Sequence, residues 1–338
     1  MATIGDVAKA AGVSRSTASY ALSGKRSISP EVVSKVMAAV EALGYAPNAG
    51  ARALATSQTM VLGLLVQFLQ DEFAPAMLQY MLGVADVARE LGYDILMVTE
   101  PDGARALKRI TDQRMVDGVV LLNVADDDDR LPVLRAAPQP GALVGLPLDC
   151  TGLDVFDLDF AEAGRMMVDH LAGLGHREAV LVLQPEHVLV RGGGYVRRLR
   201  DAAVEQAAVR GLLLHVEHGE SQQPAVGAHL VDLLDRYPQA TGLLLHNEAA
   251  AAALPSVLNA RGLQAPRDLS VVGRYSDEFA RTFSLPYSSI ESAPDRLGRL
   301  AVRQLVRRIE DPTSQEPYVV RLLQPELVDR GSTAAPQA

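Results

Sequence analysis

Short apolar runs alternate with stretches of helical length over most of this 338-residue chain. The pattern begins with residues 60–66 (MVLGLLV) and a helical stretch near 75–91, and further apolar runs follow at 95–98, 119–122, 143–146, 179–183, 242–245 and 270–272. Strands that alternate with helices in this way predict doubly wound parallel sheets. Two such sets predict two α/β lobes, in which ligands bind beyond the carboxyl ends of the strands.

The first 58 residues have a different charge from the rest of the chain. They carry six Lys or Arg and three Asp or Glu, a formal charge of +3, out of 32 basic and 41 acidic residues in all. The remainder therefore holds 26 basic and 38 acidic residues, a charge of −12. A basic head on an acidic body is the asymmetry expected of a DNA-binding module joined to another domain.

The composition excludes several classes of protein. Hydrophobic residues make up 48% of the chain and charged residues 22%, which excludes a disordered polymer. No window holds roughly 18 uninterrupted apolar residues, the length that a membrane span needs. The first residues mix charges where a signal peptide is apolar, and the single cysteine, Cys150, excludes an internal disulfide or a cysteine-built zinc site. We therefore expect a cytoplasmic protein.

The head begins with the signals of two helices separated by a short turn. Thr3 and Asp6 have the spacing of a capping box. Gly12 can adopt the left-handed conformation that ends a helix, and Ser14 can cap a second helix that runs to about Leu22. Two helices joined by so short a Gly-containing turn predict a helix-turn-helix.

A third helix is expected from Pro30 to Leu43, ended by Gly44. The second helix has a polar side opposite its apolar one, formed by Arg15, Ser16, Ser19 and Tyr20. Polar side chains on an exposed helix can enter a DNA major groove and bind base edges. The alternative is a solvated face of an ordinary three-helix bundle.

Residues 47–54 can form a helix that is too short to be stable alone, and Gly50 weakens it further. This segment should order only when it packs against something else. Leu54 is an apolar side chain with no evident core of its own, and such a residue can wedge into a minor groove.

Residues 4–54, with the pieces DVAKAAGVS, LGYAPN and ARAL, closely resemble the headpiece and hinge of the LacI/GalR transcriptional repressors. The resemblance implies that Arg15, Ser16 and Tyr20 read bases and that Leu54 is a minor-groove lever from each of two hinge helices. It further implies backbone or hinge contacts from Ser14, Thr17, Ser19, Lys25, Arg26 and Asn48.

The body carries looser landmarks of the same family, including RMVDGVVLL, RGGGY, LLLHNEAAA and LPYSSI. They imply the fold of periplasmic sugar-binding proteins, with the chain crossing between lobes near 158, 288 and 318. The expected domains are a headpiece (1–46), a hinge (47–58), a body (59–330) and a short tail (331–338). Within the body, the first lobe is expected at about 60–158 and 289–317, and the second at about 159–287 and 318–330.

The resemblance places an effector in the cleft between the lobes. The implied pocket residues are Phe68, Asp71, Phe73, Arg191, Asn247 and Tyr275, with Arg191 at the end of a strand. Several positions depart from sugar-binding relatives: Phe68 replaces a polar group, and Tyr275 and Ser276 replace a pair of carboxylates. These changes predict a more apolar cleft that takes a phosphorylated or aromatic ligand instead of a simple sugar, or no ligand.

Four other constellations have a structural interpretation that we favour over a functional one. The Gly192–Gly194 run suits a close helix start better than a phosphate cradle, and His215 with His218 suits a surface strand end better than a metal site. His176 is expected to hold the entry to a strand, and the acidic run 126–129 to be a solvated loop instead of a calcium site. We expect no metal and no cofactor.

The sequence as a whole predicts a homodimeric repressor that binds a pseudo-palindromic operator and responds to a metabolite by linkage between its two sites. The helices at about 75–91 and 248–260 are expected to supply the dimer faces. One alternative is an effector-independent regulator that uses the body only as a dimerisation scaffold. Another is a small-molecule-binding protein or enzyme, but we find no catalytic constellation and expect no enzyme.

Overall fold

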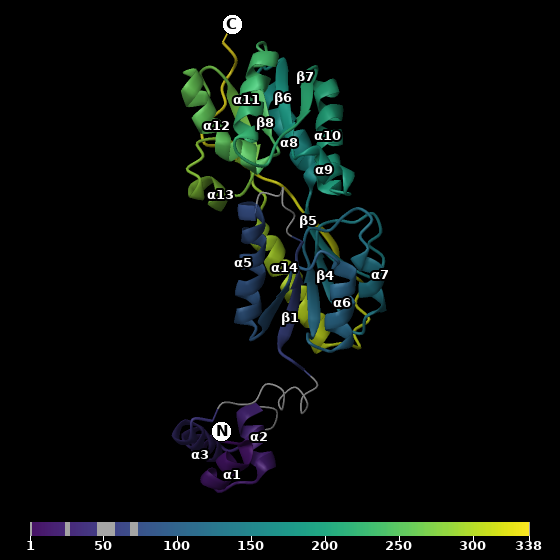
Figure 1. Ribbon diagram of the computed structural model, residues 1–338, viewed down its shortest axis with the longest axis vertical. Helices are drawn as coiled ribbons and strands as arrows, with labels where there is room; N and C mark the ends of the chain where they lie inside the picture. Colours follow the sequence, from purple (N-terminus) through teal and green to yellow (C-terminus); the bar gives the residue numbers. More distant parts are fainter. Residues whose placement is uncertain (1, 24–27, 46–57, 68–73, 338) are drawn as a thin grey trace. The chain divides into compact units, whose positions relative to one another are not determined.

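The computed structural model describes residues 2–23, 28–45, 58–67 and 74–337. The chain divides into two compact units, Met1–Thr59 and Met60–Ala338, which we call the headpiece and the body (Figure 1). The predicted combination of a helical head and a two-lobed α/β body is confirmed.

The headpiece contains the three predicted helices, with bounds α1 (Ile4–Ala11), α2 (Arg15–Ser23) and α3 (Pro30–Leu43). Thr3 and Asp6 form the predicted capping box, in which each side chain bonds the backbone of the other residue. Gly12 ends α1 with φ of 67°, in the left-handed region that favours glycine.

The three helices pack around a small core. Its fully buried members are Val7, Ala8, Ala18, Val36 and Ala39. Partly buried side chains surround them, among them Leu22 and Tyr45. Because α2 contributes only one small residue to the buried set, most of its surface remains available for other contacts.

The first lobe of the body is built on a six-stranded sheet in the order β11-β5-β4-β3-β1-β2, with every neighbouring pair parallel. The strands are β1 (Val61–Leu65), β2 (Asp94–Val98), β3 (Gly118–Leu121), β4 (Gly141–Val144), β5 (Asp154–Leu158) and β11 (Val320–Leu323). The helices of this lobe are α5 (Ala74–Glu90), α6 (Gly103–Asp112), α7 (Arg130–Ala136) and α14 (Pro294–Glu310).

The second lobe has a sheet of the same size in the order β12-β10-β9-β8-β6-β7, in which only β12 is antiparallel. Its strands are β6 (Glu178–Leu183), β7 (Leu213–His218), β8 (Gly242–Leu245), β9 (Ser270–Arg274), β10 (Ser288–Ile290) and β12 (Leu327–Val328). Its helices are α8 (Phe160–Gly173), α9 (Glu186–Val190), α10 (Gly194–Arg210), α11 (Ala225–Arg236), α12 (Glu248–Arg261) and α13 (Asp277–Thr282).

The chain crosses between the lobes three times, at residue 159, at 291–293 and at 324–326. The first crossing lies at its predicted position near 158. The second lies about three residues after the predicted position near 288, and the third about six residues after the predicted position near 318. The third prediction was wrong because residues 320–323 extend the first sheet beside β5, with Val320 paired to Val155. The second was wrong because residues 288–290 still pair with β9.

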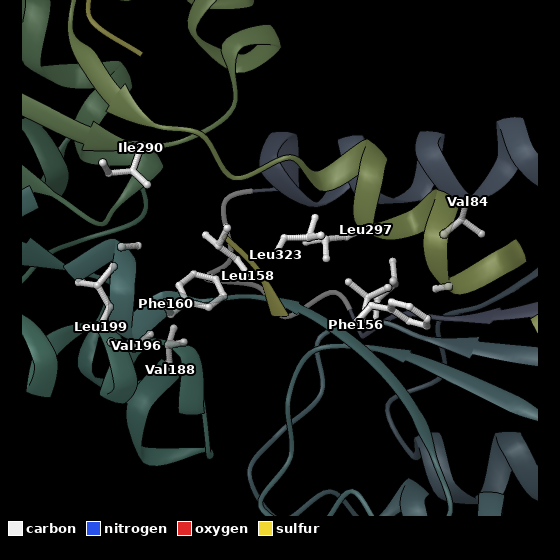
Figure 2. Packing of buried hydrophobic residues seen from close by; sticks show 14 of the residues in the cluster. Val84, Phe156, Leu158, Phe160, Val188, Val196, Leu199, Ile290, Leu297 and Leu323 are labelled. Carbon is white, nitrogen blue, oxygen red and sulfur yellow. The ribbon is translucent and has the colours of Figure 1, made fainter. Parts of the chain in front are cut away.

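A continuous apolar core runs through both lobes at these crossings. Figure 2 shows Leu158 and Leu323 from the two crossing strands near Leu297 of α14, with Phe160 beyond them toward Val188. All five side chains are buried. The lobes therefore share hydrophobic packing where the chain passes between them.

The residues predicted as a short tail, 331–338, include side-chain and backbone contacts with the second lobe. Ser332 is buried, and its hydroxyl donates to the Val271 carbonyl at 2.6 Å. The Ala334 carbonyl accepts a bond from His176 at 3.0 Å. In the part of the chain that the structure describes, no helix has both the length and the apolar character that crossing a bilayer requires.

Candidate DNA-binding face and interlobe cleft

The exposed side of α2 presents the side chains that the sequence assigns to base reading. Arg15, Ser16 and Tyr20 are exposed, whereas Ala18 on the opposite side is buried. A helix with one buried and one polar side can lay the polar side in a groove without disturbing its own core. Base reading by these three side chains is a prediction from the sequence that this exposed face allows.

Ser14 and Thr17 organise the start of this helix. The Ser14 hydroxyl accepts a bond from the Thr17 backbone N–H at 3.0 Å and lies 2.8 Å from the Thr17 hydroxyl. This is a side-chain cap, which satisfies a backbone donor that a helix start leaves unpaired. Both residues therefore have a structural role beside the predicted backbone contacts.

Arg15 lies across the first turn of α1. A Cβ atom at Gly5 would come within 2.6 Å of the Arg15 Nη2 atom, so the guanidinium lies directly against Gly5 and would move aside for a larger residue.

Seven predicted site residues lie outside the described residues, and the structure does not bear on them. They are Lys25, Arg26, Asn48, Leu54, Phe68, Asp71 and Phe73.

A cavity lies between the two lobes of the body, with about 130 Å³ of space open to the centres of water molecules. The first lobe lines it with α5 and with the residues at the carboxyl ends of β3, β4 and β5, as expected for parallel sheets. Its polar and aromatic lining consists of Tyr80, Asn123, Asp157, Phe160, Gln184, Tyr195, Arg198, Glu248 and Arg274. We call this cavity the cleft.

Arg274 is the centre of a buried polar network on the second-lobe side of the cleft. Its Nη2 atom forms an ion pair with Glu248, and its Nε atom donates to His246 Nδ1 at 3.0 Å. The other Glu248 oxygen accepts a bond from Gln184 Nε2 at 2.6 Å. Burial, with Arg274 adding to the effect, holds the pKa of His246 well below its usual value, so the imidazole is neutral and can accept this bond.

Aromatic rings stand beside this network. The rings of Phe160 and Tyr195 have centroids 5.3 Å apart, and both contact the His246 ring edge-on. The Arg274 guanidinium lies over the Phe160 ring at 5.6 Å from its centroid, within the range of a cation–π contact. The cleft therefore offers flat apolar surfaces next to charged groups.

The second ion pair of the cleft joins the two lobes. Arg198 of α10 donates through Nη2 to Asp157 Oδ2 of β5 at 3.0 Å, and through Nη1 to the Leu146 carbonyl at 3.0 Å. Asp157 also accepts bonds from the backbone N–H groups of Leu146 and Leu158. Burial raises the pKa of Asp157 to about 6, although Arg198 favours its charged form.

The predicted pocket residues that the structure describes lie around the cleft but not in its lining. Asn247 is buried and caps α12, donating to the carbonyls of Leu183 and Glu220 at 3.1 Å. Tyr275 is buried in the second lobe, and its hydroxyl donates to the Tyr287 carbonyl at 3.0 Å. Arg191 ends the short helix α9, not a strand as predicted, and borders a second, polar pocket of about 320 Å³.

Sequence reasoning did not identify Glu248 and Arg274, which line the cleft from the second lobe. It named their neighbours Asn247 and Tyr275 instead. A signal was available for Arg274, because adjacent residues of a strand point to opposite faces. The aromatic side chain of Tyr275 suits the core, which leaves Arg274 to face the cleft.

The structure also decides between the interpretations of the other constellations. Gly193 and Gly194 do form a close helix start, since a Cβ at Gly193 would lie 2.5 Å from the Val188 carbonyl oxygen. His176 bonds Thr241 at the entry to β8, as predicted. In the acidic run 126–129, Asp127 and Asp129 are exposed as predicted, whereas Asp128 is buried against Arg130 and Asp126 pairs with Arg197. Among the described residues, no group of acidic, His or Cys side chains could hold a metal ion.

Comparisons with known proteins agree with this architecture. Residues 3–48 match the family model of bacterial regulatory proteins of the lacI family, and residues 168–333 match a periplasmic binding protein-like domain. The chain is 30% identical over 327 residues to the transcriptional regulator CelR of Thermobifida fusca, covering 94% of this chain and 95% of the relative. It is 27% identical over 346 residues to the HTH-type transcriptional repressor PurR of Glaesserella parasuis, covering 98% of each.

Solved structures show the same likeness. A Lac repressor structure bound to ONPG in the repressed state has a TM-score of 0.80 at 25% identity, covering 98% of this chain and 99% of that one. A CelR–cellobiose complex has a TM-score of 0.67 at 28% identity, covering 98% of this chain and all of the other. The chain therefore belongs to the lacI family of bacterial regulatory proteins and is a DNA-binding transcriptional regulator.

Proposed function

We propose that this protein is a cytoplasmic homodimeric repressor of a pseudo-palindromic operator, and that its effector is a small, uncharged, polar metabolite with a flat or ring-shaped body. Each headpiece would place α2 in the major groove of one half-site, with Arg15 addressing guanine and Ser16 and Tyr20 its neighbours. The hinge at 47–58, with Leu54, would open the minor groove between the half-sites.

The proposed dimer face is on α5. Leu78 and Leu82 lie one turn apart on this helix, and each keeps about half of its surface exposed (51% and 49%). Helix α12 is a weaker candidate for the second face, since most of its length is buried in its own lobe. We therefore assign the first-lobe part of the dimer contact to α5.

The observation that carries the effector class is the charge balance of the cleft. Its two arginines are each paired with a carboxylate inside the cleft, Arg198 with Asp157 and Arg274 with Glu248. A phosphorylated ligand would need an unpaired cation, and charge that is buried without a partner is costly. An uncharged ligand that carries both donors and acceptors can bond to these groups and leave each pair intact.

Relatives support this class of ligand. The names of similar proteins include a ribose operon repressor, and one similar structure is a complex with cellobiose. Sugars and nucleobases both combine a ring with several hydrogen-bonding groups. The Phe160 and Tyr195 rings can stack on either, so the cleft favours this shared chemistry without separating the two.

Calorimetry with the full chain tests the proposal against neutral sugars, nucleobases and nucleosides, with the phosphorylated form of each as a parallel series. We expect binding by at least one neutral compound, and loss of that binding in Arg198→Met. Arg200→Met is the matched control, because Arg200 lies on the same helix but pairs with its neighbour Asp201 outside the cleft. Binding confined to phosphorylated compounds, or binding that Arg198→Met leaves unchanged, contradicts the proposed effector class.

A second candidate function is an effector-independent regulator. It is favoured by one observation, that the arginines of the cleft are already paired with carboxylates without a ligand. If calorimetry detects no binding of any compound in either series, and the same protein still binds operator DNA, this candidate would be preferred over the first.

A further inference from the structure

Helix α10 of the second lobe contacts the first lobe through its first two turns. The Asp126 carboxylate of the first lobe lies so close to the helix start that a Cβ at Gly194 would come within 1.9 Å of its Oδ1 atom. A carboxylate at this end of a helix is stabilised by the helix dipole. The Asp126 backbone N–H also donates to the Gly192 carbonyl at 2.8 Å, which joins the two loops directly.

Two successive arginines of α10 reach across this contact. Arg197 donates to Asp126 Oδ2 through Nη2 at 2.8 Å and through Nε at 3.3 Å. Arg198 donates to Asp157 and to the Leu146 carbonyl, both in the first lobe. Cations of the second lobe thus meet carboxylates of the first lobe at two adjacent positions.

The two pairs differ in their relation to the cleft. Arg198 and Asp157 line it, whereas Arg197 and Asp126 do not. A ligand in the cleft therefore contacts one pair directly and can reach the other through the shared helix or through the Arg198 guanidinium, whose Nη1 atom lies 3.8 Å from Asp126 Oδ1. The Arg197–Asp126 pair is partly exposed, with 38% and 16% of the side-chain surfaces accessible, so salt can screen it.

We propose that Arg197 and Arg198, with Asp126 and Asp157, form an arginine latch that holds the two lobes closed when no effector is bound. The chain crossings between the lobes are short connections that can act as hinges, so the latch sets the population of the closed form. An effector would act on it through Arg198 and Asp157. Only this last step rests on the proposed effector function.

The latch is tested by the distance between the lobes in the ligand-free full chain, which does not depend on any effector. Nitroxide labels on Lys108→Cys in the first lobe and Val209→Cys in the second, in a Cys150→Ser background, place both labels at exposed positions. Pulsed electron resonance then gives the distribution of distances. We expect one narrow distribution in the otherwise unmodified protein.

Arg197→Gln should broaden this distribution and shift it to a different mean. Asp126→Asn should do at least as much, because it also removes the contact of Asp126 with Arg198. The double variant should match Asp126→Asn, because that change already removes the partner of Arg197. Arg200→Gln, which removes an equal charge from α10 without touching the first lobe, should leave the distribution narrow. Raising the salt from low to molar concentration should broaden the unmodified distribution and not that of Arg197→Gln.

An unchanged distribution in both Arg197→Gln and Asp126→Asn, with each variant folded by circular dichroism, would overturn the latch. So would an equal effect of Arg200→Gln. Neither result would touch the effector proposal, which calorimetry tests separately. Conversely, a protein that binds no effector can still show the predicted distances.

Discussion

The headpiece packs a handful of small side chains from three helices that follow one another directly in sequence, whereas the core of the body joins strands from both halves of the chain. The exposed face of α2 comes from a single nine-residue helix. The cleft instead draws on segments from residue 76 to residue 274. The comparison teaches that the exposed face of α2 depends on local caps and one helix, while the cleft depends on buried ion pairs that only the complete body assembles.

The largest effect should come from breaking a buried pair of the body. Glu248→Gln leaves the Arg274 guanidinium, which is almost fully buried, without its counter-ion. Removal of one partner from such a pair costs about 3–5 kcal/mol, and we expect this loss in the free energy of unfolding of the body, measured with denaturant. Hydrogen exchange of α1 and α3 should stay unchanged.

Asp112→Ala is the control for this variant, because its partner Lys108 is exposed and surface pairs contribute at most about 1 kcal/mol. A body as stable with Glu248→Gln as without it would show that the network around Arg274 does not support the fold.

A change in pH should affect the stability of the headpiece and that of the body in opposite directions. Burial raises the pKa of Asp157 to about 6, so its contribution to stability is full below the unfolded value near 4 and is lost as pH rises through 6. A shift of this size corresponds to about 3 kcal/mol. In the headpiece, bonds from Thr3 lower the pKa of Asp6, so its contribution is present above pH 4 and is lost on acidification.

The free energy of unfolding of the body, relative to that of the Asp157→Asn variant, should therefore rise as the pH is lowered from 7 to 4. At the lower end of this range, the amide hydrogens of α1 should exchange faster. A constant difference between the two proteins across this range would contradict the assigned burial of an ionised Asp157.

A smaller effect is expected for base reading. Arg15→Ala removes an exposed guanidinium from α2, and a good contact to a base is worth about 1–3 kcal/mol. We expect operator affinity, measured by fluorescence anisotropy, to fall by the equivalent factor with little change in affinity for random duplex. Lys35→Ala on α3 is the control, because it removes the same charge from another helix. An equal loss of operator affinity in this variant would mean that Arg15 contributes only its positive charge and does not read a base.

The smallest effect should come from the cap of α1. Thr3→Ala removes the side-chain half of the capping box, which typically costs about 1 kcal/mol. Ser29→Ala is a matched control, because Ser29 holds the same position before α3 without a side-chain cap bond. In thermal melting of the full chain, only Thr3→Ala should lower the melting temperature of the headpiece. Equal melting temperatures for the two variants would contradict a stabilising role of the capping box.

The sequence predicted the headpiece helices almost to the residue because their signals are local: caps, a glycine stop and an apolar face. It also located most strands of the body to within a few residues. It did not identify β5, β10, β11 or β12. At β5, Asp154 and Asp157 interrupt the apolar pattern. Both are buried in the structure, Asp154 against Arg308 and Asp157 against Arg198.

The lining of the cleft was harder to predict for the same reason. Whether Arg274 or Tyr275 faces the cleft depends on which side of β9 meets the other lobe, and that side is fixed by pairing with β8 and β10. Such pairing joins residues far apart in sequence. The family resemblance supplied the location of the cleft but not the identity of the side chains that fill it.

The central claim is that the basic headpieces of this chain recognise a specific DNA sequence through α2. Selection of bound duplexes from a random pool by the full chain, at moderate salt, tests it most directly. The account predicts enrichment of a two-fold-related site that Arg15→Ala weakens at particular base positions. Enrichment of no sequence over random duplex, by protein shown to be folded, would contradict it.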